Sequence, residues 1–310
     1  MIELTNECQL QCITCPRDKA FASDYRIGRM SKHDFQHVFD QFAPRLEVLD
    51  LTGLGESLTH PEFFDIVRYV RDQRHLHLYL TTNTILLTDR IVAQLHETPV
   101  NTLCISIDGT SQEEYAAVRG PLNFAKLKAR VRKAVSRLAE RMEFILCVVL
   151  VHGNMDSMLR FVDLAAELEI RRLSLKPMNL VGNELPTDYY LPFRTPRFNE
   201  LSTAAVEHGN ALGVEVNVFR IGSYQCMFPW EPIYVTWDGY VVPCCAKPFP
   251  NVMNFGNLLE EDWASIRNSA PFVDFRRHLL RGRRAPSFCN KCHIMDKTLF
   301  QSGLPILQIL

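Results

Sequence analysis

Three cysteines near the start of the chain have the spacing of a metal-binding loop. Cys8, Cys12 and Cys15 form a Cys-x3-Cys-x2-Cys pattern directly after a short strand-like run at residues 2–5. Thiolates are the ligands that iron–sulfur clusters require, because soft sulfur suits iron. Three of them on one loop can hold three irons of a [4Fe–4S] cluster and leave the fourth iron open to a cofactor. Taken alone, the spacing also fits an incomplete zinc site or an accidental grouping.

A second set of cysteines lies in the last third of the chain. Cys226, Cys244, Cys289 and Cys292 supply four thiolates from two separated segments. Four thiolates close a tetrahedral zinc site or hold a complete [4Fe–4S] cluster, and the residues alone leave both open. Cys245 is left over beside Cys244, either as a small packed residue or as the ligand in its place.

Composition narrows the class of protein. The 310 residues are 47% hydrophobic and carry a formal net charge of -1. A chain of this length and composition can bury a full hydrophobic core. Its net charge is too small to attract it electrostatically to nucleic acid or to a membrane surface. It lacks both a secretory signal and an apolar run of the roughly 18 residues that cross a bilayer. We therefore expect a cytoplasmic protein whose cysteines are ligands rather than disulfides. Cys104 and Cys147 lie in apolar runs and are interpreted as buried hydrophobes.

Alternating strand and helix patterns predict the elements that position these cysteines. Strands are expected at 2–5, 46–51, 76–82, 102–107, 144–151 and 172–176, and again at 214–219. Helices are expected from the capping box at Ser31 to Asp34, at 62–72, 126–141 and 155–168, and at 198–212. A hairpin at 233–242 should turn at Asp238-Gly239 in a type I′ conformation.

The repeated βα units predict an α/β fold with a parallel sheet and helices outside it. Six units are fewer than the eight of a closed TIM barrel, so we expect a partial (β/α)6 barrel. The expected division is a barrel at 1–180, a linker with a bridging helix and strand at 181–221, and a small α+β domain at 222–310.

The amino-terminal cysteine loop resembles that of the radical S-adenosylmethionine (SAM) superfamily, and later motifs agree in order. Gly53, Gly55 and Glu56 follow the second strand and are similar to the family's Gly-Gly-Glu-Pro, with Ser57 in the proline position. Asn83 belongs to a Thr-Asn-Gly-like motif in which Thr84 takes the glycine position.

The fourth strand and the residues after it complete the resemblance. They contribute Ser106, Asp108 and Arg119, with Tyr115 between them. The resemblance implies that these three residues and the earlier motifs bind SAM, whose amino and carboxylate groups chelate the open iron. Thr14 stands where the family often has an aromatic residue before the third cysteine. The resemblance covers about residues 1–180.

The carboxy-terminal cysteines resemble the SPASM/twitch extension of the same superfamily. This resemblance favours one auxiliary [4Fe–4S] cluster held by Cys226, Cys244, Cys289 and Cys292, rather than zinc. It also implies a catalytic role for Cys245 as a hydrogen-atom donor, because an unligated cysteine donates a hydrogen atom to the substrate radical in related epimerases. The expected cofactors are thus SAM and two [4Fe–4S] clusters.

The cysteine layout is similar to that of dehydrogenases and epimerases that tailor aminocyclitols and aminoglycosides. We expect hydrogen abstraction from a polar, sugar-like substrate, ending in oxidation or epimerisation. Peptide maturation and a non-catalytic electron carrier are the alternatives. His152, Lys176 and Tyr224 are pocket candidates near strand ends or junctions. A basic stretch is a candidate docking surface for an acidic flavodoxin- or ferredoxin-type reductant. It comprises Arg276, Arg277, Arg281, Arg283 and Arg284.

Overall fold

The computed structural model describes residues 1–17, 24–73, 75–182, 185–221, 226–228, 230–280, 287–289 and 291–292. Six parallel strands form one sheet in chain order, and two short strands form an antiparallel hairpin. The strands are β1 (Val48–Asp50), β2 (His77–Thr82), β3 (Thr102–Ser106), β4 (Glu143–Leu150), β5 (Arg172–Pro177), β6 (Glu215–Val218), β7 (Tyr234–Val235) and β8 (Val241–Val242). This confirms the partial barrel; the limits of the three expected segments stay a prediction.

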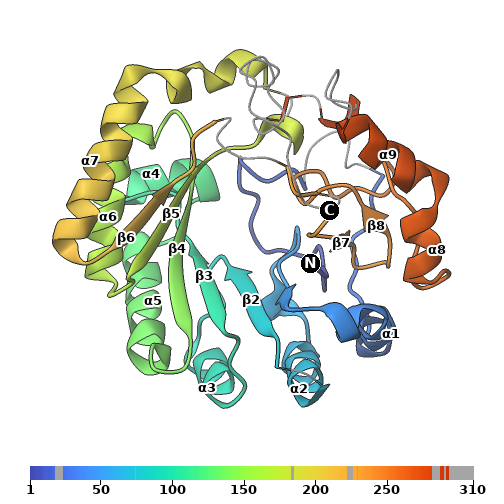
Figure 1. Ribbon diagram of the computed structural model, residues 1–310. Coiled ribbons are helices and arrows are strands. Elements are labelled where there is room, and N and C mark those ends of the chain that lie inside the picture. The colour runs from blue at the N-terminus through green and yellow to red at the C-terminus, as the bar shows by residue number, and fades with distance from the viewer. Residues whose placement is uncertain are drawn as a thin grey trace.

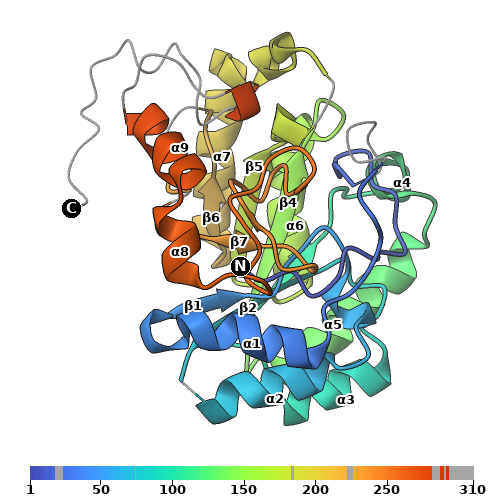
Figure 2. The ribbon, with the colours of Figure 1, turned by 90° about the vertical axis from the view of Figure 1, so that its right-hand side faces the viewer.

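Helices follow the outer side of the curved sheet (Figure 1). They are α1 (Lys32–Phe42), α2 (Phe63–Gln73), α3 (Asp89–Glu97), α4 (Gln112–Arg119), α5 (Phe124–Leu138), α6 (Met158–Glu167), α7 (Pro196–Leu212), α8 (Trp263–Asn268) and α9 (Ala270–Leu280). Helices α8 and α9 lie beside the β7–β8 hairpin at the open side of the arc (Figures 1 and 2). None of the described helices is long and apolar enough to span a membrane.

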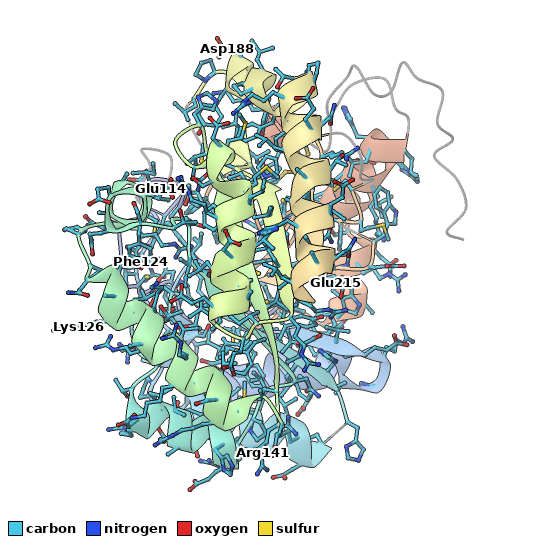
Figure 3. All side chains as sticks on the ribbon, turned by 90° about the vertical axis from the view of Figure 1, so that its left-hand side faces the viewer. Glu114, Phe124, Lys126, Arg141, Asp188 and Glu215 are labelled. Carbon is cyan, nitrogen blue, oxygen red and sulfur yellow. The ribbon has the colours of Figure 1, made fainter. Side chains whose placement is uncertain are left out.

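Local sequence explains where several helices begin. The Ser31 hydroxyl accepts the Asp34 N–H at the start of α1, which confirms Ser31 as the residue that caps this helix. Helices α3 and α4 were not expected from the sequence, although Thr88 and Ser111 cap them in the same way. Figure 3 shows α6 and α7 side by side on the outer face, with Asp188 at one end of the molecule and Arg141 at the other.

The strand expected at residues 2–5 is wrong, because this segment makes only single bridges. The Ile2 N–H donates to Asp50 O (3.0 Å), and the Glu3 N–H donates to Val235 O (2.9 Å). The segment therefore joins the edge strand β1 to the β7–β8 hairpin without extending either sheet. It thereby connects the barrel to the domain that follows it.

The hairpin turn also differs from its prediction. A type I′ turn needs positive φ at both central residues, but here Gly239 has φ 90° and Asp238 is not among the positive-φ residues. The Gly239 N–H donates to Thr236 O (2.9 Å), and Thr236 N–H donates to Tyr240 O (2.9 Å). A turn ending in a left-handed glycine therefore replaces the two-residue loop.

Alternate residues of the six strands point away from the helices and form what we call the inner face. In β4 the outward residues Phe144 and Leu146 are buried, while Ile145 and Cys147 are only half-buried. The sheet thus packs its outer side against the helices and leaves its inner side polar and partly exposed. The inner face comprises Val48, Asp50, His77, Tyr79, Thr81, Thr102, Cys104, Ser106, Glu143, Ile145, Cys147, Val149, Arg172, Ser174, Lys176, Glu215 and Asn217.

A chain of side-chain contacts crosses the amino ends of five strands on this inner face. The Thr102 hydroxyl contacts His77 Nε2 (2.9 Å) and donates to Glu143 (3.1 Å). Arg172 then joins Glu143 (2.5 Å) to Glu215 (2.8 Å). We call these five residues the barrel floor; their charges are paired with one another.

Candidate active site

The amino-terminal cysteine loop lies at the carboxyl ends of the strands and is held by its own backbone and by the Arg17 side chain. Cys15 N–H donates to Cys12 O (3.0 Å), and Arg17 donates to Cys8 O (3.0 Å). The Cys8 sulfur accepts the Leu10 N–H (3.5 Å). Burial raises the pKa of the Cys12 thiol to about 11, and the Arg119 guanidinium opposes that rise. Bound iron would instead hold these groups as thiolates.

The glycine motif packs directly beneath this loop. A Cβ on Gly55 would lie 2.4 Å from Thr5 O and 2.5 Å from Glu7 O, so only glycine lets the two backbones approach. The next residue fixes the contact, since the Glu56 N–H donates to Glu7 O (2.8 Å). A Cβ on Gly53 would meet the Glu3 side chain at 2.4 Å. Both predicted glycines are therefore constrained by close approach.

The Glu56 carboxyl is buried, and only one of its oxygens is satisfied. Its Oε2 accepts the Asn83 N–H (2.7 Å), while Oε1 has no hydrogen-bond partner among the described residues. Burial raises the pKa of Glu56 to about 7, and the hydrogen bond from Asn83 opposes this rise. A buried carboxylate oxygen without a donor suits an ammonium group, such as the amino group of SAM.

Asn83 links this carboxyl to the cysteine loop. Its side-chain amide nitrogen lies 3.5 Å from the Cys8 sulfur, and its amide oxygen accepts the Ile85 N–H (3.1 Å). Thr84, in the position of the family's glycine, has φ 72°, a conformation that β-branched residues rarely adopt. The Thr84 hydroxyl donates to Asn83 O (2.5 Å), which stabilises this unusual backbone.

The predicted residues at the end of β3 and after it differ in their surroundings. Asp108 is fully buried and uses both carboxylate oxygens, one for the Val149 N–H (2.7 Å) and one for Arg119 Nε (2.7 Å). Asp108 thus orients Arg119, whose charge acts on Cys12. Ser106 is half-buried on the inner face, opposite Cys147. The Tyr115 hydroxyl is buried without a partner among the described residues.

The carboxy-terminal cysteines lie close to one another. Burial raises the pKa of Cys226 to about 11 and of Cys289 to about 12, and the Cys292 thiol adds to both rises. Cys292 N–H donates to Cys289 O (3.1 Å). The Cys245 thiol is the main cause that raises the pKa of Cys244, and burial adds to it. This thiol-rich environment suits a four-thiolate site.

Both cysteine sets consist of thiols, the ligands that iron–sulfur clusters use. Within the described part of the chain, no three His, Cys, Asp or Glu side chains converge on a point that would hold one metal ion. Cluster cysteines bind separate irons, so this finding does not count against a cluster at either set. The residues present fit SAM and a cluster at the amino-terminal loop, and a cluster at the carboxy-terminal set.

Cys245 differs from its neighbour Cys244 in its surroundings. It is exposed, whereas Cys244 is half-buried. The adjacent Cys244 thiol lowers the pKa of Cys245 and burial raises it; Asp50 raises it further, and Lys176 lowers it. Asp50 and Lys176 are inner-face residues, so charges of the inner face act on Cys245. Cys147 is half-buried on the inner face, so it is not the fully buried core residue that the sequence predicted.

Other predicted residues fall outside this cluster. The His152 ring stacks on Tyr189 at 3.9 Å and contacts Tyr189 O (2.8 Å), which holds it in a structural contact. Arg277 pairs with Asp274 (3.3 Å), and Arg276 lies over the Phe272 ring. Four predicted residues lie outside the described residues: Tyr224, Arg281, Arg283 and Arg284.

Comparison with known proteins agrees with this geometry. The family model described as the radical SAM superfamily matches residues 2–165, and an iron–sulfur cluster-binding domain, SPASM, matches residues 226–293. The chain is 26% identical to a tungsten-containing aldehyde ferredoxin oxidoreductase cofactor-modifying protein of Pyrococcus furiosus, over 95% of this chain and 87% of that protein.

Solved structures share the fold at low sequence identity. Streptococcus suis SuiB bound to its precursor peptide SuiA superposes with a TM-score of 0.70 and 16% identity, over 95% of this chain and 69% of SuiB. BtrN in complex with AdoMet and 2-DOIA gives a TM-score of 0.55 and 16% identity, over 96% and 94%. The chain therefore belongs to the radical SAM superfamily, whose members use SAM and a [4Fe–4S] cluster, and it carries an additional iron–sulfur cluster-binding domain.

Proposed function

We propose that the protein abstracts a hydrogen atom from a polar, sugar- or aminocyclitol-like small molecule, and that oxidation or epimerisation follows. One observation carries this proposal. The inner face is polar and partly exposed, and the charges of two of its residues, Asp50 and Lys176, act on the exposed Cys245 thiol. A polar surface beside a hydrogen-atom donor suits a hydroxylated or aminated substrate better than an apolar one.

The residues have distinct roles in this proposal. Cys8, Cys12 and Cys15 hold the amino-terminal cluster, and Glu56 receives the amino group of SAM. Arg119, oriented by Asp108, is available to the SAM carboxylate, because Asp108 occupies only its Nε. Ser106 adds a hydroxyl on the inner face. When bound, SAM and the cluster together supply a primary carbon radical, so the barrel must exclude water and present a single C–H bond.

Cys245 decides between the two outcomes. In epimerisation its S–H gives a hydrogen atom to the substrate carbon on the face opposite the one that lost hydrogen. The resulting sulfur radical then takes one electron and one proton, supplied by a flavodoxin- or ferredoxin-type reductant and by water. In oxidation the substrate radical instead gives one proton to water and one electron, which an auxiliary cluster held by the carboxy-terminal cysteines would accept, and no thiol is consumed.

Deuterated water separates these outcomes. Thiols exchange with solvent, so epimerisation through Cys245 places one deuterium at the inverted carbon, whereas oxidation leaves that carbon without hydrogen. Turnover should be measured with SAM and dithionite by counting 5′-deoxyadenosine. Cys245→Ala protein that gave the same inverted product with wild-type yield would remove the thiol from the mechanism.

A peptide substrate is the second candidate, and the resemblance to peptide-bound SuiB favours it. A maturase would alter a precursor peptide, whereas the first proposal requires a small molecule. Incubation with each class, followed by mass spectrometry, distinguishes them. A non-catalytic electron carrier is disfavoured, because it would need neither the SAM-binding residues nor membership in a SAM-dependent enzyme family.

The carboxy-terminal cysteines are proposed to hold one auxiliary [4Fe–4S] cluster through Cys226, Cys244, Cys289 and Cys292. Iron and sulfide analysis of protein in which Cys8, Cys12 and Cys15 are replaced by alanine tests this assignment. One cluster should remain in that protein. Zinc in place of iron would contradict it.

A further inference from the structure

The Asn83 side chain is fixed by its own turn at the end of β2. Asn83 directly follows Thr82, the last residue of β2, and is only 7% exposed. Its side-chain oxygen accepts the Ile85 N–H (3.1 Å), a local turn that asparagine forms readily. Thr84 between them has the left-handed φ of 72°. Because a backbone donor binds the amide oxygen, the positions of oxygen and nitrogen in this amide are distinguished.

The Asn83 amide nitrogen is directed at a cysteine sulfur. It lies 3.5 Å from Cys8 Sγ, within hydrogen-bonding distance of a sulfur acceptor. The Leu10 N–H reaches the same sulfur, also at 3.5 Å. Cys8 is half-buried, so its sulfur is partly withdrawn from water. Two N–H donors thus converge on the first cysteine of the amino-terminal loop.

Asn83 also contacts Glu56, but through its backbone. The Asn83 N–H donates to Glu56 Oε2 (2.7 Å). Every residue except proline keeps this N–H, whereas the contact to Cys8 requires a side-chain donor. The family resemblance implies that Asn83 binds SAM, yet the described contacts of its side-chain nitrogen lead to Cys8. Substitution at this position therefore separates the contact to Glu56 from the contact to the sulfur.

We propose that Asn83 is a positioning residue that acts through Cys8: the hydrogen bond from its amide to the sulfur raises the reduction potential of the amino-terminal cluster. This inference rests on the proposed function, because it takes Cys8 as a ligand of that cluster. Reduction transfers one electron from the external reductant to the cluster and makes its sulfurs more negative. An N–H donor stabilises a more negative acceptor more strongly, and hydrogen bonds to the sulfurs are among the factors that set cluster potentials. Without the Asn83 donor, the cluster should be harder to reduce.

A redox titration of the anaerobic holoenzyme with SAM tests the inference. Dithionite lowers the potential stepwise, and electron paramagnetic resonance (EPR) follows the signal that responds to SAM. Asn83→Leu has a similar shape without an N–H donor, and it should shift the reduction equilibrium about tenfold toward the oxidised cluster, which is about 59 mV more negative for a one-electron couple. Asn83→Asp keeps an oxygen for the Ile85 N–H but also lacks the donor, so its potential should fall at least as far.

Thr84→Gly is the matched control. It alters the same turn, suits the positive φ and leaves the Asn83 donor in place, so its potential should equal that of the wild type. The potential of the carboxy-terminal cluster is the internal reference and should not move in any variant. Calorimetry should give Asn83→Leu a SAM affinity close to that of the wild type, because the backbone N–H to Glu56 remains.

A wild-type potential in both Asn83 variants would overturn the inference, whether or not SAM binding weakened. So would an equal shift in Thr84→Gly, because the turn rather than the donor would then set the potential. Loss of the cluster from both Asn83 variants would overturn it too, since the three thiolates should hold the cluster without this bond. Wild-type protein without a SAM-responsive EPR signal would contradict the proposed function itself, whereas a SAM-responsive signal whose potential ignores Asn83 would contradict only the role of Asn83.

Discussion

The buried Glu56 carboxyl makes SAM affinity depend on pH. Raising its pKa from 4.5 to about 7 corresponds to about 3 kcal/mol against the ionised form in the SAM-free protein. The ammonium group of SAM next to Oε1, which has no hydrogen-bond partner within the described ranges, would favour the ionised form and lower this pKa. SAM binding must therefore release a proton below pH 7, and the dissociation constant should rise about tenfold from pH 8 to pH 6.

Calorimetric titration of the anaerobic holoenzyme with SAM, at pH 6, 7 and 8, measures this dependence. Glu56→Gln keeps the shape of the side chain but cannot ionise, so its SAM affinity should be weaker throughout and flat with pH. Glu3→Gln is the matched control, because the pKa of Glu3 is also about 7 while its carboxylate faces Leu54 N–H and the Tyr234 hydroxyl. It should retain the slope. A pH-independent wild-type affinity, or an unchanged slope in Glu56→Gln, would refute the reasoning.

Three further predictions follow from buried contacts. Gly55→Ala should lose the iron of the amino-terminal cluster, because its Cβ meets backbone oxygens, whereas Gly153→Ala, which meets nothing within 4 Å, should keep full iron content. Burial raises the pKa of Glu3, so its contribution to stability is present below pH 4.5 and lost as pH rises through 7. Between pH 5 and 8 the unfolding free energy measured with urea should therefore fall less in Glu3→Gln than in the wild type, by up to about 3 kcal/mol. Equal falls in the two proteins would argue against this prediction. Tyr190→Phe removes the hydrogen bonds of the Tyr190 hydroxyl to Leu180 N–H and Lys291 O. It should lower the unfolding free energy by about 1–2 kcal/mol and weaken iron retention beside Cys292. Unchanged melting and iron content would contradict this prediction.

Short-range patterns predicted the barrel well. The alternation of β4 and the apolar period of α5 give elements within three residues of their observed ends, because burial on one side fixes both patterns. Thr84 illustrates a deeper agreement: the family has glycine there, and the backbone keeps the positive φ that glycine would allow.

Features that depend on contacts distant in sequence could not be predicted. Residues 2–5 have strand-forming composition, yet they are shared between β1 and β7, which lie far apart along the chain. The effect of the Asp50 and Lys176 charges on Cys245 depends on how the hairpin packs on the barrel. The sequence predicted Cys147 to be a buried core residue because its neighbours are apolar. In the structure it is half-buried, because its strand position turns it to the inner face of the sheet.

The most direct test of the central claim is EPR spectroscopy of the reduced, anaerobically reconstituted protein before and after SAM is added. In the proposed assignment Cys8, Cys12 and Cys15 leave one iron without a protein ligand, so SAM should change the spectrum of one cluster and leave the carboxy-terminal cluster unchanged. Identical spectra with and without SAM would contradict the assignment of an open iron at the amino-terminal loop.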